Sequence, residues 1–212
     1  MAREKYPTMK GRNPTHRLPT TPYPTLNRMI DTGNMYEIGY ENLRNYAAVI
    51  LPYCSGLRPV EMQNARVENI SPDFTTIYVD VVKGQDKYGE PRHTPIHESG
   101  RRIIERYVKT RNALFGPTGY LFTVNGRDKL STNTLRRFKK AVETEINHNF
   151  DFREARRTYG QMLIDEGNDI EDVSRVMGHR TSKTTETYYA RRTQGSAVAN
   201  ILNRWKKQGE NQ

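Results

Sequence analysis

The stretch from Val176 to Arg192, VMGHRTSKTTETYYARR, combines a histidine, several hydroxyl side chains and two adjacent tyrosines in a strongly basic setting. Tyrosine is usually a packing residue with a polar tip. Among cations, a tyrosine hydroxyl has a second use, as a nucleophile aimed at a phosphate. Tyr188 and Tyr189 are therefore candidate nucleophiles, and the rest of the chain has to show whether a phosphate is their target.

The charge of the chain favours a polyanionic partner. Its 212 residues include 34 lysines and arginines against 24 acidic residues, a net charge of +10. Such a balance is typical of nucleic-acid-binding proteins, although charge alone does not separate DNA from RNA or an anionic membrane. No run approaches the roughly 18 apolar residues of a membrane-spanning helix, and the N-terminus lacks the apolar core of a signal peptide. Cys54 is the only cysteine, which excludes an internal disulfide and a cysteine metal cluster and fits a reducing, cytoplasmic setting.

The patterns along the chain predict a mostly helical domain behind a flexible start. Residues 1–25 are basic and proline-containing with little periodicity, which indicates an arm, either a disordered tail or a DNA-clasping segment. Apolar periodicity then predicts several helices, at about 25–32, 41–54, 98–113, 131–147, 152–166, 169–177 and 196–207. A short helix is expected to start at Pro59, where the missing N–H is tolerated.

A small antiparallel sheet interrupts the helices. Residues 74–82, FTTIYVDVV, alternate and are rich in β-branched side chains, as in a strand, and residues 91–96, PRHTPI, can return beside them. The intervening KGQDKYGE is turn-like, so the two segments predict a hairpin. The short segment YLFT near residue 120 is a candidate edge strand.

Four sequence boxes resemble the tyrosine recombinases, also called phage-type integrases. SGLRPVEM around Arg58 resembles the family's TGLRxxE box, and VVKGQDKYGEPRHTPI resembles its lysine hairpin. The block that starts FREARRTYGQ and ends MGHRTSKTTETYY resembles HxxR, then LGH, then the nucleophilic tyrosine. The resemblance covers about residues 40–190, with the boxes in the family's order and at its separations. It implies a mainly α catalytic domain with a small antiparallel sheet.

The resemblance also selects among neighbouring candidates. In the family, the second arginine precedes the LGH histidine by about 23 residues, which selects Arg156 over Arg157 when counted back from His179. The nucleophile follows that histidine by about nine residues, which selects Tyr188 over Tyr189.

The family's hairpin lysine is matched best by Lys83. It stands directly before Gly84, whereas Lys87 lies further into the turn. The resemblance implies that this lysine protonates the departing 5′ oxygen of DNA, as a general acid.

The remaining roles are implied by the resemblance, and the chemistry of a phosphodiester gives a reason for each. Transesterification passes through a pentacoordinate state with extra negative charge, which suits two permanently charged guanidiniums. Arg58 and Arg156 would form that clamp, His179 would hydrogen-bond the scissile phosphate, and Tyr188 would attack it. The product is a 3′-phosphotyrosine that stores the bond energy for religation. The resemblance implies no metal, ATP or other cofactor.

One residue departs from the family pattern. Arg153 stands where HxxR has its histidine. Arginine does not deprotonate in proteins, so Arg153 cannot act as a general base for Tyr188, although it can donate hydrogen bonds to phosphate. Proton removal then falls to His179, to water or to the phosphate itself.

The implied function is a site-specific DNA recombinase or integrase, as found in mobile elements, viruses and plasmids. Two alternatives stay open at this point. One is strand relaxation like that of a type IB topoisomerase, which uses similar chemistry. The other is a DNA-binding regulator with impaired catalysis, which the arginine at position 153 leaves possible. A covalent-adduct assay separates the regulator from the two enzymes.

The predicted organisation is an arm (1–25), a catalytic domain (26–190) and a tether with an amphipathic helix (191–212). In the last segment, Val198, Ile201, Leu202 and Trp205 form one apolar stripe. The stripe can dock on its own domain or, as the resemblance implies, on a neighbour, linking four protomers on double-stranded DNA. Off DNA, a monomer or weak oligomer is expected. Family members usually carry a further core-binding domain, so the chain is either a fragment or a naturally short recombinase.

Overall fold

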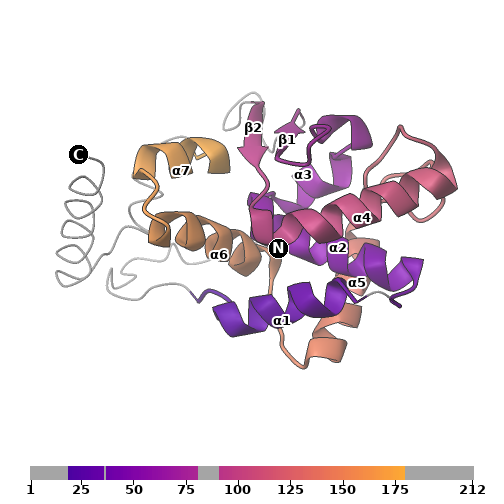
Figure 1. The fold of residues 1–212 in the computed structure, drawn as a ribbon, viewed down its shortest axis with the longest axis horizontal. Helices are drawn as coiled ribbons and strands as arrows, with labels where there is room; N and C mark the ends of the chain where they lie inside the picture. Colours follow the sequence, from indigo (N-terminus) through magenta and orange to yellow (C-terminus); the bar gives the residue numbers. More distant parts are fainter. Residues whose placement is uncertain (1–18, 36, 81–90, 180–212) are drawn as a thin grey trace, which may run out of the picture.

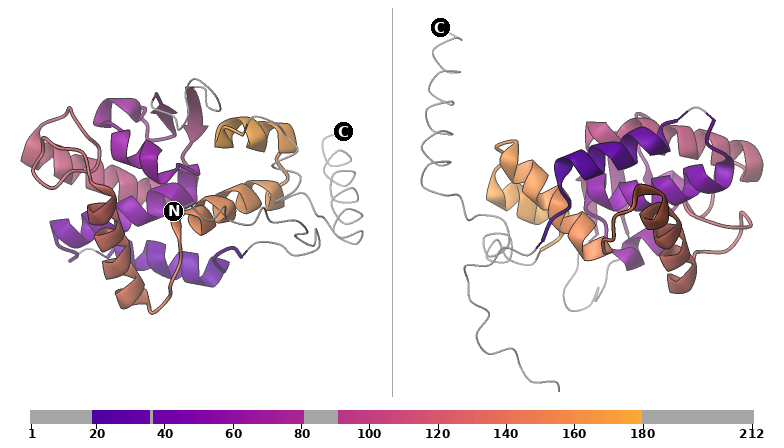
Figure 2. Two further views of the ribbon diagram at one scale, coloured as in Figure 1. Left: turned by 180° about the vertical axis from the view of Figure 1, so that it is seen from behind. Right: turned by 90° about the horizontal axis from the view of Figure 1, so that it is seen from below.

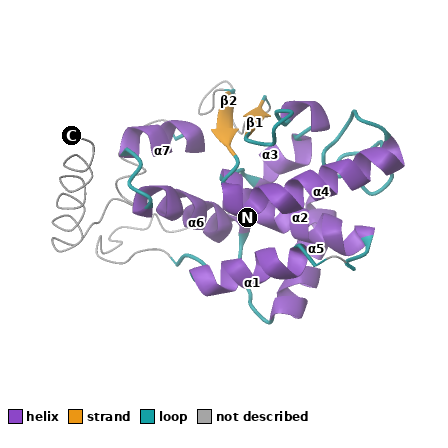
Figure 3. Cartoon of the chain, in the orientation of Figure 1, coloured by secondary structure: helices purple, strands orange, loops and turns teal. Residues whose placement is uncertain are grey.

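The computed structural model describes residues 19–35, 37–80 and 91–179 (Figure 1). This part of the chain is mostly helical, with one small sheet (Figure 3), which confirms the predicted mainly α class. Its α-helices are α1 (Tyr23–Gly33), α2 (Tyr40–Ser55), α3 (Pro59–Asn64), α4 (Glu98–Phe115), α5 (Thr132–Ile146), α6 (Phe152–Asp165) and α7 (Ile170–Met177). None of these helices is long and apolar enough to cross a bilayer. The helix predicted at 196–207 lies outside the described residues.

Helix α2 is the centre of the core. From Leu43 to its end every residue is buried, and the helix packs against α1, α4, α5 and α6. Figure 2 shows the same helical arrangement from behind and from below. A helix that is apolar on nearly all faces belongs in such a position, because no face is left for water. It ends at Ser55, and the next residue, Gly56, has a left-handed φ of 66° that terminates the helix before α3.

The predicted hairpin is present but its strands are shorter than expected. Strand β1 (Thr76–Val79) pairs antiparallel with β2 (Arg92–Pro95), placing Val79 opposite Arg92. The prediction began β1 at Phe74, but that residue has a φ of +57° and so is not extended. Residues 81–90, including the predicted turn, lie outside the described residues.

The candidate edge strand YLFT is not a strand. Tyr120 makes a single bridge to Arg66, and no ladder continues from it. Leu121 and Phe122 are almost fully buried, so their apolar character reflects core packing of a connecting segment. A short apolar run does not distinguish these two situations.

The segment before α1 is anchored on α6, although it falls within the predicted arm of residues 1–25. Thr21 is buried, and its N–H donates to the Thr158 hydroxyl at 2.9 Å. Its own hydroxyl donates to Glu154 at 2.6 Å. The carbonyl of Pro19 accepts from Arg157 at 2.9 Å. Because hydrogen bonds hold this segment, its sequence shows no apolar periodicity that would predict the contact. The arm stays a prediction for residues 1–18, which lie outside the described ranges.

Candidate active site

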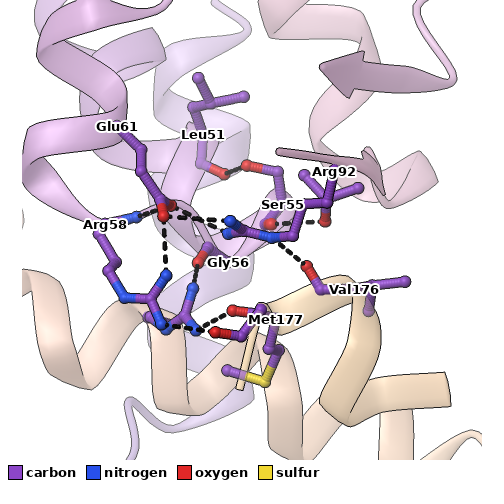
Figure 4. A network of polar contacts seen from close by, with 11 residues as sticks. Leu51, Ser55, Gly56, Arg58, Glu61, Arg92, Val176 and Met177 are labelled. Atoms are coloured by element: carbon purple, nitrogen blue, oxygen red, sulfur yellow. Dashed lines mark hydrogen bonds and ion pairs between the residues drawn. The ribbon is translucent and has the colours of Figure 1, made fainter. Parts of the chain in front are cut away.

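The candidate site is built around the C-terminal end of α7. The last carbonyl groups of a helix lack partners within it and carry a partial negative charge, so cations are favourable there. Three arginines from three separate elements donate to consecutive carbonyls (Figure 4): Arg92 to Val176 at 2.9 Å, Arg156 to Met177, and Arg58 to Gly178 at 2.9 Å. The end of α7 is therefore the point at which distant parts of the sequence meet.

Arg58 is held by the start of α3. It is the N-cap residue, with extended backbone, and Pro59 occupies the first helical position. The Glu61 carboxylate accepts a hydrogen bond from the Arg58 backbone N–H at 2.8 Å. It also forms an ion pair with Nη1 of the Arg58 side chain at 2.7 Å. The Arg58 side chain remains 26% exposed.

Glu61 is a fully buried carboxylate shared by two guanidiniums. Besides Arg58, it accepts from Nη1 and Nη2 of Arg92 at 3.1 and 3.0 Å. Burial pushes the pKa of Glu61 up, but the hydrogen bonds and charge of Arg92, with those of Arg58, outweigh it and hold the pKa below its usual value. The carboxylate is thus charged where it meets both arginines.

Arg156 lies on α6, whose N-terminus is capped by the Asp151 side chain. The guanidinium is buried and donates to the carbonyl of Gly56 as well as to α7. Two features of Gly56 disfavour any side chain at this position. Its φ is positive, and a Cβ would lie 2.5 Å from the Tyr159 ring. The glycine of SGLR therefore lets α2 end against α6 directly beneath Arg156.

His179 follows the left-handed turn at Gly178, and its N–H donates to the Ser174 carbonyl at 3.0 Å. Burial, followed by repulsion from Arg156, Arg58 and Arg92, lowers the pKa of His179 to about 3. The imidazole is consequently neutral at physiological pH, with one nitrogen as a donor and the other as an acceptor.

Of the predicted site residues, Arg58, Arg156 and His179 are brought together, while Arg153 is exposed on α6 one turn before Arg156. The predicted roles of Lys83 and Tyr188 fall on residues outside the described ranges. Tyr159 is buried and donates to the Pro95 carbonyl at 3.0 Å. Within the described part of the chain, no three His, Cys, Asp or Glu side chains are placed to hold a metal ion.

Two residues of this cluster were not singled out from the sequence. Glu61 lies in the SGLRPVEM box, and its position three residues after Arg58 was a usable signal, because that spacing brings side chains together at a helix start. Arg92 had no such signal, since a lone arginine in a strand is usually solvent-exposed.

The family model described as "Phage integrase family" matches residues 19–195. This chain belongs to the phage integrase family. Among curated members, it is 30% identical over 151 residues to tyrosine recombinase XerA of Pyrococcus horikoshii, covering 70% of this chain and 50% of the relative. It is 28% identical over 174 residues to XerC of Leptospira interrogans, covering 76% and 53%. The chain thus spans about half the length of these phage integrase relatives.

Solved structures of recombinases share the fold of this phage integrase family member. The XerA recombinase crystal structure superposes with a TM-score of 0.68 at 19% identity, covering 90% of this chain and 64% of that one. The Tn1549 transposon integrase, in complex with transposon right-end DNA, gives 0.60 at 19% identity, with 88% and 65% covered. XerH bound to its difH substrate gives 0.62 at 15% identity, with 81% and 50% covered. The fold is therefore that of a tyrosine recombinase catalytic domain.

Proposed function

We propose that this chain cleaves and rejoins DNA strands as a site-specific recombinase, through a covalent 3′-phosphotyrosine. The observation that carries the proposal is the meeting of Arg58, Arg156 and the neutral His179 at the end of α7. Two guanidiniums and a neutral imidazole form a donor set suited to a phosphodiester whose negative charge increases during reaction. Membership of the phage integrase family supports the same conclusion.

In the proposed reaction, the Tyr188 hydroxyl oxygen attacks phosphorus while the bond to the 5′ oxygen breaks. Lys83 gives its proton to that departing oxygen, and the DNA 3′ end remains bonded to tyrosine. Arg58 and Arg156 offset the charge on the non-bridging oxygens, and His179 donates a hydrogen bond to one of them. Attack by a 5′ hydroxyl reverses the step and releases the enzyme. Side-chain cations carry the charge stabilisation, so we propose that neither a metal nor ATP is required.

Arg153 gives the proposed site a basic group at the position where the HxxR motif of the family has a histidine. Its exposure on α6 leaves it able to reach a phosphate, and we assign it that role. It cannot receive the Tyr188 proton. A neutral His179 has one unprotonated ring nitrogen, so proton removal is left to His179, a water molecule or the phosphate.

The proposed partner is double-stranded DNA, on which four copies of the chain assemble in the synaptic complex. The net charge of +10 supports backbone binding, as does the presence of DNA in the solved complexes of the Tn1549 integrase and XerH. Off DNA, the chain is proposed to be a monomer or weak oligomer. The predicted apolar stripe within residues 191–212 supplies the link between copies.

The test is capture of DNA in a covalent adduct. Nicked suicide duplexes carrying a randomised site are incubated with the wild-type chain in EDTA without ATP, and denaturing gels report the adduct. Tyr188→Phe should abolish the adduct while leaving duplex binding nearly unchanged, and the matched control Tyr189→Phe should retain it. Adduct formation by Tyr188→Phe at the wild-type yield, or a strict Mg²⁺ requirement for cleavage, would refute the proposal. Sequencing the captured DNA identifies the target site.

A further inference from the structure

Arg92 is a cation on β2 that uses all three guanidinium nitrogens within the candidate site. Nε donates to the Val176 carbonyl at 2.9 Å, and Nη1 and Nη2 donate to the two oxygens of Glu61. Its side chain is only 9% exposed. Figure 4 shows this guanidinium lying between the Glu61 carboxylate and the end of α7.

We propose that Arg92 is a positioning residue for strand cleavage, which fixes Arg58 through Glu61 and fixes the turn before His179 through Val176. The inference rests on the proposed recombinase function. Arg92 itself need not touch DNA, because its three nitrogens are already directed at protein acceptors.

The first route runs through the shared carboxylate. Glu61 holds Arg58 by its backbone N–H and by Nη1, so the orientation of the carboxylate sets the orientation of that guanidinium. Arg92 contacts both carboxylate oxygens, which prevents the carboxylate from rotating about its terminal bond. Without this fork, a buried Glu61 would have only Arg58 as its cation, and the geometry of Arg58 would be less restricted.

The second route runs through the turn that carries His179. A Cβ added at Gly178 would lie 2.8 Å from Cζ of Arg92 and 2.9 Å from its Nε and Nη1. The guanidinium therefore rests directly on the Gly178 backbone, while it also bonds the carbonyl two residues earlier. Because Gly178 has a φ of 62° and immediately precedes the histidine, a shift of Arg92 displaces the imidazole as well as Arg58.

The test compares Arg92→Lys and Arg92→Gln with wild type in single-turnover cleavage of the captured DNA site, at saturating protein. Lysine keeps the charge beside Glu61 but cannot reach both carboxylate oxygens and Val176 together. We expect both variants to lower the cleavage rate by about 10- to 100-fold, as for a displacement of reacting groups by about 1 Å. The dissociation constant for the duplex should change by less than about threefold, because the contacts that Arg92 loses are to protein.

Arg106→Gln is the matched control. Arg106 also donates from one helix to carbonyls at the end of another, those of Asn34 and Met35, but these follow α1 and lie outside the site. A general effect of removing a helix-capping arginine would appear in this variant too. We expect its cleavage rate to stay within about twofold of wild type once folded protein is quantified by circular dichroism.

The outcomes separate the inference from the function on which it rests. Wild-type cleavage by Arg92→Lys overturns the inference, and this variant decides the matter if Arg92→Gln does not fold. Equal losses of binding and cleavage also overturn it, since they indicate general damage. In a double-variant cycle, Glu61→Gln with Arg92→Gln should lose less cleavage rate than the product of the two single losses, because the route through Glu61 is common to both, and fully multiplicative losses contradict that shared route. Absence of any adduct with wild type instead refutes the proposed function, and the inference with it.

Discussion

Replacing His179 with glutamine is expected to make the folded protein less sensitive to mild acid. In the folded chain, burial and the nearby guanidiniums of Arg156, Arg58 and Arg92 lower the pKa of His179 from 6.5 to about 3. In the unfolded chain the imidazole titrates near its ordinary value of about 6.5. Between these values the unfolded state binds a proton that the folded state does not, so stability falls as pH drops from about 6.5 toward 3. Glutamine has no such proton.

The size of the effect follows from the two pKa values. At about pH 7.5 the imidazole is neutral in both states and contributes almost nothing to the pH dependence. At pH 5, which is about 1.5 below the unfolded pKa, protonation favours the unfolded state by about 2 kcal/mol, at roughly 1.4 kcal/mol per tenfold change in proton concentration. The wild-type chain should therefore lose about 2 kcal/mol more than the variant over this interval.

Urea unfolding followed by circular dichroism measures the difference. Wild type, His179→Gln and His179→Asn are compared at about pH 7.5 and pH 5, at one ionic strength, so that all other titrating groups cancel in the comparison. Both variants should show the same reduced loss, since neither amide titrates. An equal loss of stability in all three proteins would show that the imidazole does not lie among the three guanidiniums in the folded state.

Three further predictions concern packing, DNA binding and assembly. Gly56→Ala should lower the free energy of unfolding by about 1–3 kcal/mol, because its Cβ would meet the Tyr159 ring at 2.5 Å in a positive-φ conformation. Gly167→Ala, also at positive φ but with open space around the Cβ, should cost less, and an equal cost in urea unfolding would exclude the ring contact as the cause. The logarithm of DNA affinity should fall with the logarithm of salt concentration, with a slope near −0.9 per phosphate neutralised, and a flat response would remove DNA as the main partner. Deleting residues 196–212 should leave a folded protein that binds one DNA site but forms no synaptic complex on native gels. Recombination by the truncated protein would contradict exchange of the predicted C-terminal helix between copies. Loss of folding on truncation would favour docking of that helix within one copy.

Several parts of the fold could be predicted because a local physical signal specifies them. Helices α2 and α7 were expected from the apolar periodicity of residues 41–54 and 169–177, close to the observed bounds. The short helix α3 was expected from Pro59, whose ring suits a first helical position. Each signal lies within a few residues of the element that it predicts.

The features that the sequence did not predict depend on contacts between residues that are distant in the chain. Thr21 looked like part of an arm because its anchors, on α2 and α6, lie more than 30 residues away in the sequence. Arg92 looked like an ordinary strand residue because its carboxylate partner is on α3 and its carbonyl partner is on α7. The family resemblance selected Arg58 and Arg156, but only the tertiary structure shows what holds them.

The arginine contacts at the end of α7 also determine when the site can exist during folding. They join residues 120 apart for Arg58 with Gly178 and 84 apart for Arg92 with Val176, while Arg156, which contacts Met177, also reaches Gly56 at the end of α2, 100 residues away. Contacts of such long sequence separation form only after most of the chain is ordered, because closing the loops between them costs entropy before any contact repays it. A nascent or partly unfolded chain would therefore carry the positive charge of the sequence while its three arginines are not yet gathered at the end of α7. In the proposed function, cleavage of a DNA strand would therefore require these long-range contacts to be in place, and an incompletely folded copy would not nick DNA.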